Sequence, residues 1–162
     1  MSEIDWTKPN READAWIAEH VFDYHWDWCW TPERLNQASL ELAQKLWYRH
    51  LRPPRMSKKE GEPPEGAHID TEYYYDGPRY TDVIDSAWEI VEEAGYQGYW
   101  CQLRTPFGAD GECNDGYWCG FTPHLTSGWN GTPDHWVSAA TLPLAICHSA
   151  YLLWEGTQGA PE

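Results

Sequence analysis

Aromatic residues with polar neighbours concentrate between residues 96 and 136, and they are the best candidates for a binding site. Planar rings can stack on a nucleobase, while asparagine, histidine and arginine side chains can hydrogen-bond its edge or a phosphate. A loop with two tryptophans and two histidines cannot easily bury all of them, and exposed aromatic residues often mark contact surfaces. The predicted ligand-binding residues are Tyr99, Trp100, Arg104, Trp118, His124, Trp129, Asn130, His135 and Trp136. The alternative interpretation is that these rings fill the core.

Cysteine and histidine residues are the candidates for metal binding or nucleophilic catalysis. His25 and Cys29 would share one face of a strand, but about 13 Å apart, which is too far for a single ion. The sequence has no Cys-x-x-Cys pair, the spacing that zinc sites commonly use. No glycine-rich elbow surrounds Cys101, Cys119 or Cys147. We therefore predict no metal site, no cofactor and no catalytic residue.

The charge distribution restricts the partners. The net charge is −15; residues 1–79 contain ten basic and fifteen acidic side chains, whereas residues 80–162 contain one basic side chain, Arg104, and eleven acidic ones. Such a surface repels phosphate backbones, so we expect no direct binding of nucleic acid. It could instead attract a basic protein. Solubility alone would also account for the charge.

The N-terminal sequence is acidic and lacks the apolar stretch of a secretory signal. No run approaches the ~20 apolar residues of a membrane span. The five cysteines are odd in number, which does not suit a complete disulfide framework. We therefore expect a cytoplasmic protein with free thiols that does not bind membranes.

Hydrophobic periodicity and capping residues predict alternating helices and strands. Helices are expected at residues 10–22, 31–51, 81–94 and 142–154, with caps at Asn10, Thr31, Thr81 and Thr141. Strands are expected at residues 24–30, 68–76, 96–103 and 117–122, of which 68–76 would be an edge strand. Residues 52–66 are predicted to form a flexible basic, proline-rich loop, and residues 156–162 a frayed tail.

A chain of 162 residues with this element order fits one domain. We predict an α/β fold: a single-domain α-β-α sandwich over residues 1–162. A small, mainly antiparallel sheet would include a hairpin rich in tryptophan and tyrosine, and helices would flank it.

Several segments resemble the phage ABA sandwich domain family, small proteins encoded by bacteriophages and prophages. The resemblance rests on Tyr80-Thr-Asp82 leading into Ala87-Trp-Glu-Ile-Val-Glu92, on the aromatic hairpin, on Leu142-Pro-Leu-Ala-Ile-Cys-His148 and on Ile17 to Trp26. It covers residues 78–154 well and 12–30 loosely, and it leaves out 31–76. It implies a layered α/β/α fold and a phage accessory protein, and it supplies no catalytic motif.

With this resemblance, we expect a non-enzymatic protein in the cytoplasm of an infected bacterium that antagonises host defence by binding. It would sequester a nucleotide-type immune signal in an aromatic pocket that homo-oligomerisation completes. The alternative is an acidic inhibitor that imitates nucleic acid and blocks a basic host protein or nuclease. A nucleotide hydrolase and a virion protein remain open as further alternatives.

Overall fold

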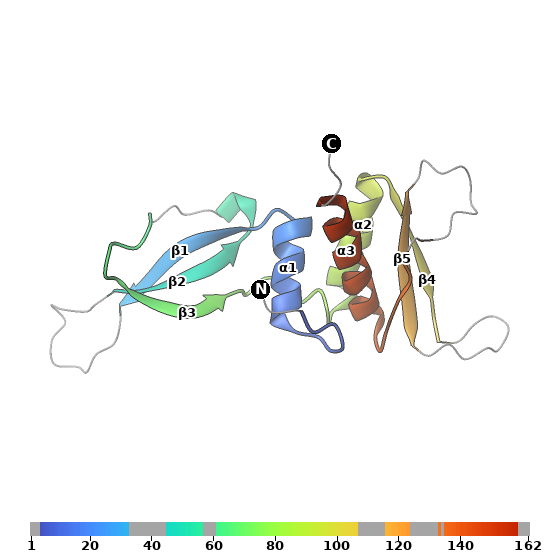
Figure 1. The fold of residues 1–162 in the computed structure, drawn as a ribbon, viewed down its shortest axis with the longest axis horizontal. Helices are drawn as coiled ribbons and strands as arrows, with labels where there is room; N and C mark the ends of the chain where they lie inside the picture. Colours follow the sequence, from blue (N-terminus) through green and yellow to red (C-terminus); the bar gives the residue numbers. More distant parts are fainter. Residues whose placement is uncertain are drawn as a thin grey trace. The chain divides into compact units, whose positions relative to one another are not determined.

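The computed structural model describes residues 4–32, 45–56, 61–106, 116–123, 133 and 135–158 (Figure 1). The chain folds into two compact units: residues 1–21 with 78–162 form the first unit, and residues 22–77, inserted between them in sequence, form the second. The described residues contain three α-helices and two three-stranded sheets, so the predicted α/β fold is confirmed.

The first unit contains the predicted aromatic hairpin. Its antiparallel sheet has the order β4 (Tyr99–Arg104), β5 (Tyr117–Pro123) and β6 (Val137–Ala139). Helices α2 (Ile84–Tyr96) and α3 (Leu142–Gln158) lie against this sheet, and α1 (Arg11–Val21) lies on the other side of α3 (Figure 1). The core between these layers includes Ile17, Ile90, Leu144 and Ile146, each at most 1% exposed. Burying a side chain of this size stabilises the fold by about 1.5–3 kcal/mol.

The predicted cap of α1 is confirmed, whereas the predicted cap of α2 is wrong. The Ala13 N–H donates to Oδ1 of Asn10 at 2.8 Å. Helix α2 begins only at Ile84, and its N-cap residue Val83 makes no side-chain capping bond. Thr81 is buried and bonded to α1 instead, because its Oγ1 accepts the N–H of Asn10 at 3.2 Å. Tertiary hydrogen bonds therefore occupy the hydroxyl that the sequence pattern assigned to a helix cap.

Asp14 completes the junction between α1 and the segment that leads into α2. Its side chain is only 4% exposed, and its Oδ1 accepts the Thr81 N–H at 2.7 Å. Burial raises the pKa of this carboxyl above its ordinary value, although the hydrogen bonds from Thr81 oppose the shift. The fold therefore favours the protonated form. The stabilisation that comes from protonated Asp14 is complete below the pKa that this carboxyl has in the unfolded chain. It is lost as the pH rises through the higher pKa of Asp14 in the folded protein.

We expect Asp14→Asn to be at least as stable as the unmodified protein at pH 7, because an amide oxygen can still accept the Thr81 N–H without a buried charge. Asp14→Ala should lose about 1–3 kcal/mol, since it leaves that N–H buried and unpaired. Urea denaturation between pH 4 and pH 8 measures both effects, and the asparagine variant should show the weaker pH dependence. Equal stability of the two variants at pH 7 would contradict this role of Asp14.

Helix α2 does not bury its most apolar face. Helical spacing in the sequence groups Ile84, Ala87, Trp88 and Val91 on one side of the helix, but Ile84 and Trp88 are 42% and 45% exposed. The buried residues are Ala87, Ile90 and Ala94. Both faces contain apolar residues at helical spacing, and the one with two alanines lies against the core. Small side chains allow close packing there, and the bulky indole remains outside.

The ends of the last two helices also differ from prediction. Helix α2 continues through Gly95 to Tyr96, and the left-handed glycine that follows it is Gly98, at φ +90°. Helix α3 starts at Leu142 as predicted but continues to Gln158 rather than fraying from residue 156. Residues 159–162 lie outside the described residues.

The second unit is a mixed sheet, and it corrects the predicted helix at residues 31–51. Its strands, in the order β1-β2-β3, are β1 (His25–Pro32), β2 (Lys45–Arg52) and β3 (His68–Tyr74). Strand β2 pairs antiparallel with β1 and parallel with β3, so the strand predicted at 24–30 and the edge strand predicted at 68–76 are confirmed.

The pairing of β2 explains why its helical pattern failed. Trp47 lies opposite Trp30, and Leu51 lies opposite Trp26. Aromatic cross-strand pairs stabilise sheets, and they outweigh a helical spacing of leucines. Residues 33–44 of the predicted helix lie outside the described residues, as do residues 57–60 of the predicted flexible loop. A single 3-10 turn, Pro54–Met56, follows β2.

Candidate functional site

Strand alternation divides the predicted binding residues between the two faces of the first unit's sheet. Successive side chains of a strand point to opposite faces, so Tyr99 and Trp100 cannot contribute to the same surface. Cys119 and Phe121 are buried and face α3, because Phe121 lines a pocket with Ser149 and Leu153 of that helix and Cys119 forms a hydrogen bond with Ser149. Trp118 therefore lies on the opposite face, which we call the outer face, and the pairing of β4 with β5 places Trp100 and Arg104 there too.

The outer face combines exposed rings with a cation. Trp100 is 60% exposed. Arg104 lies directly opposite Trp118, and its Cζ is 4.3 Å from the centroid of the Trp136 ring. A guanidinium that stacks on an indole keeps its in-plane N–H groups available for an anion. The face therefore offers a stacking surface and a donor for a phosphate or carboxylate next to each other.

Polar and small residues fill the space between these rings. Gln102 lies between Trp100 and Arg104 along β4, and its Nε2 donates to Oγ1 of Thr122 at 3.4 Å. Opposite Gln102 is Gly120, where an added Cβ would lie 2.5 Å from Cβ of Pro133. Pro133 therefore packs directly on the strand at this glycine. Sequence reasoning missed Gln102, although period-two alternation links it to Trp100 and Arg104.

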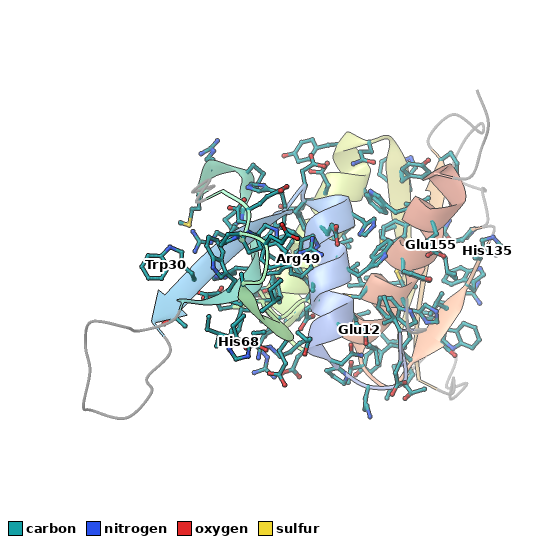
Figure 2. All side chains as sticks on the ribbon, turned by 60° about the vertical axis from the view of Figure 1, so that its left-hand side comes forward. Glu12, Trp30, Arg49, His68, His135 and Glu155 are labelled. Atoms are coloured by element: carbon teal, nitrogen blue, oxygen red, sulfur yellow. The ribbon has the colours of Figure 1, made fainter. Side chains whose placement is uncertain are left out.

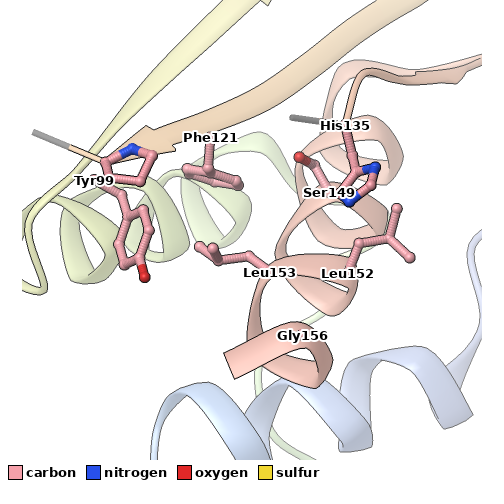
Figure 3. Close-up of a pocket in the computed structure, with 8 residues that line it drawn as sticks. Tyr99, Phe121, His135, Ser149, Leu152, Leu153 and Gly156 are labelled. Atoms are coloured by element: carbon pink, nitrogen blue, oxygen red, sulfur yellow. The ribbon is translucent and has the colours of Figure 1, made fainter. Parts of the chain in front are cut away.

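The opposite face of the sheet, which packs against the helices and which we call the inner face, borders a pocket of about 280 Å³. Tyr99 and His135 line this pocket (Figure 3). Its lining consists of Tyr99, Phe121, Pro123, His135, Ser149, Leu152, Leu153 and Gly156. Figure 3 shows Phe121 between β5 and α3, with Leu152 and Leu153 on the helix and His135 beside Ser149. Among the described residues of the lining there is no lysine or arginine, so they suit an uncharged group better than a phosphate. The α3 residues were missed because a sequence does not reveal which helix covers a strand.

Three of the predicted binding residues, His124, Trp129 and Asn130, lie outside the described residues. The other six divide into four on the outer face or next to it (Trp100, Arg104, Trp118, Trp136) and two in the pocket (Tyr99, His135). One continuous site made of all six would conflict with the alternation of the strand.

The second unit holds another arginine–tryptophan stack, which sequence reasoning missed. Cζ of Arg49 lies 5.0 Å from the ring centroid of Trp26 and 6.0 Å from that of Trp28. Figure 2 shows Arg49 and, near the end of β1, Trp30. The sequence contained part of the signal, because alternate residues of β1 are tryptophans, but the register that places Arg49 opposite Trp28 is seen only in the structure.

The Cys119 and Cys147 thiols are poor nucleophiles. Sγ of Cys101 and Sγ of Cys119 lie 3.7 Å apart. The hydrogen bond with Cys101, together with burial, raises the pKa of the Cys119 thiol, and burial raises the pKa of Cys147. Both thiols therefore stay protonated, and thiolate chemistry at these two positions is disfavoured.

Within the described residues, no group of three histidine, cysteine, aspartate or glutamate side chains could hold a metal ion. In that same part of the chain, every helix is too short or too polar to cross a membrane. Comparisons with protein-family models, curated proteins and solved structures find no match to this chain. The resemblance to the phage ABA sandwich domain family therefore stays a prediction.

Proposed function

We propose that this protein is a non-enzymatic binding protein that sequesters a nucleotide-type small molecule on the outer face of its β4-β5-β6 sheet. The observation that supports this proposal best is the Arg104 guanidinium 4.3 Å above the Trp136 ring, on the face that also exposes Trp100. A nucleotide combines a planar base with an anion, and this face offers a partner for each.

The spacing favours a ligand with two planar groups. Trp100 and Arg104 are four residues apart on β4, about 13 Å along the strand. Trp118 lies directly opposite Arg104. The two tryptophans that would stack on bases, Trp100 and Trp118, therefore lie near opposite ends of the outer face, and the Arg104 guanidinium lies beside Trp118. A dinucleotide supplies two bases and a linking phosphate. Stacking on tryptophan is worth about 1–3 kcal/mol per base.

Charge argues for a small molecule rather than a nucleic-acid strand. Long strands bind through many phosphate contacts, and their affinity comes mainly from phosphates that lysine and arginine neutralise. Arg104 is the sole basic residue from position 80 to the end of the sequence, where eleven acidic residues also lie. One guanidinium can satisfy one phosphate, but the acidic surface would repel the rest of a polymer.

The biological setting rests on the family resemblance alone. In that setting the protein is a phage accessory protein that acts in the cytoplasm of an infected bacterium and removes a nucleotide immune signal from its receptor. Binding without chemistry would suffice for this role. A homo-oligomer would present several outer faces and raise the amount of signal that one assembly removes.

Calorimetric titration tests the binding. We expect cyclic or linear dinucleotides to bind more tightly than mononucleotides, and a single-stranded oligonucleotide to bind weakest. Binding that depends mainly on stacking should persist at about 0.5 M salt, where charge attraction is screened. The ligand should be recovered with unchanged mass after the protein is denatured. Absence of heat with every nucleotide, or conversion of the nucleotide, would overturn the proposal.

A further inference from the structure

Helix α2 exposes a face that is both apolar and acidic, opposite the face that packs in the core. Its exposed apolar side chains are Ile84 (42%), Trp88 (45%) and Tyr96 (86%). The carboxylates of Asp85, Glu89 and Glu92 are exposed on the same helix. Exposed apolar groups with a polar rim are typical of protein interaction sites. The buried residues Ala87, Ile90 and Ala94 leave this face without a role in the core.

Helical spacing places the carboxylates around the Trp88 ring. Asp85 lies three residues before Trp88 and Glu92 four residues after it, and such pairs are neighbours on a helix surface. Glu89 lies four residues after Asp85, so two carboxylates of like charge are also adjacent. Like charges at this spacing destabilise a helix by a few tenths of a kcal/mol, and a bound cation would relieve that repulsion. None of the three forms an ion pair within the described part of the chain.

We infer that this face of α2 docks a basic segment of a partner protein, with an arginine or lysine over Trp88 and its charge shared among Asp85, Glu89 and Glu92. An indole ring attracts a cation to its face, and neighbouring carboxylates strengthen the attraction. Ile84 and Tyr96 then supply apolar contacts at the two ends of the helix.

The dimensions and charge of the face select this occupant over others. From Ile84 to Tyr96 the helix extends about 18 Å, which is longer than a small molecule would cover. Docking of the same α2 face from a second copy would place Asp85, Glu89 and Glu92 against their counterparts, and these like charges would repel each other. Anionic lipid would be repelled for the same reason. A protein segment with several basic residues satisfies both the length and the charge.

The test is fluorescence anisotropy of a labelled helical peptide that carries arginines at positions i, i+4 and i+7 beside a leucine stripe, with the full-length protein at about 0.1 M salt. Trp88→Ala should weaken binding at least tenfold, as expected for a central aromatic anchor. Each of Asp85→Asn, Glu89→Gln and Glu92→Gln should weaken it roughly two- to fivefold. A peptide with glutamine in place of arginine should not bind.

Two control variants distinguish peptide binding at this face from unspecific attraction to acidic residues and from binding at the outer face. Glu155→Gln removes an exposed carboxylate on α3, and Trp100→Ala removes an exposed tryptophan on β4; both should leave peptide affinity unchanged. Equal loss with Glu155→Gln would show unspecific charge attraction and overturn the inference. So would unchanged affinity in Trp88→Ala, or self-association in ultracentrifugation that Trp88→Ala abolishes. Nucleotide binding should not change in Trp88→Ala, so this site and the outer face can fail independently.

Discussion

Trp100→Ala is expected to weaken nucleotide binding by about tenfold or more without changing the stability of the fold. The ring is 60% exposed, so its removal uncovers little of the core. Loss of one stacked base costs about 1–3 kcal/mol, which corresponds to roughly five- to 150-fold in affinity. Calorimetric titration with the tightest ligand measures the change, and urea denaturation checks the fold.

Trp88→Ala is the matched control for this variant, because it removes a ring of the same type and similar exposure from α2. It should bind the ligand as the unmodified protein does. Arg104→Gln should also weaken binding, and it should reduce the salt dependence, because the charged donor beside Trp136 is gone. If Trp100→Ala and Trp88→Ala bind equally well, the ligand does not stack on the outer face.

Gly120→Ala is expected to destabilise the protein by about 1–3 kcal/mol, the usual cost of forcing extra atoms into a packed site. Its new Cβ would lie 2.5 Å from Cβ and 2.6 Å from Cγ of Pro133, and 3.0 Å from the carbonyl oxygen of His135. A proline ring and a backbone carbonyl cannot rotate away as a flexible side chain would. Pro133 and His135 must therefore shift, and Trp136 should shift with them.

Urea denaturation of Gly120→Ala measures the loss of stability, and ligand titration should show a second loss because Arg104 loses its stacking partner. Gly95→Ala is the control. It lies in α2 with nothing within 4 Å of an added Cβ, so it should match or exceed the stability of the unmodified protein. If Gly120→Ala is as stable as Gly95→Ala, the close packing of Pro133 on β5 is contradicted.

The sequence predicted those elements whose local and tertiary signals agree. The Asn10 cap, the β4–β5 hairpin and the start of α3 follow from capping chemistry, alternation and periodicity, and the structure contains all three. The helix predicted at residues 31–51 failed because the cross-strand partners of Trp47 and Leu51 are distant in sequence. Thr81 failed as a cap for a similar reason, since Asn10 and Asp14 hold it.

The candidate site was predictable in composition but not in shape. The residue types of Trp100, Arg104 and Trp118 indicated recognition of planar anionic ligands, and the register placed all three on one face. Strand alternation alone would have separated Tyr99 from them. The stack of Arg104 on Trp136 and the packing of Pro133 on Gly120 are tertiary contacts, which no local pattern encodes.

The most direct measurement is native mass spectrometry of the full-length protein purified from bacteria that contain an active nucleotide-signalling defence system, repeated after denaturation. The proposed function predicts a stoichiometric adduct with the mass of a nucleotide, released intact on denaturation and missing from Trp100→Ala. A protein without any adduct, recovered from cells in which the signal is present and still elevated, would contradict sequestration on the outer face.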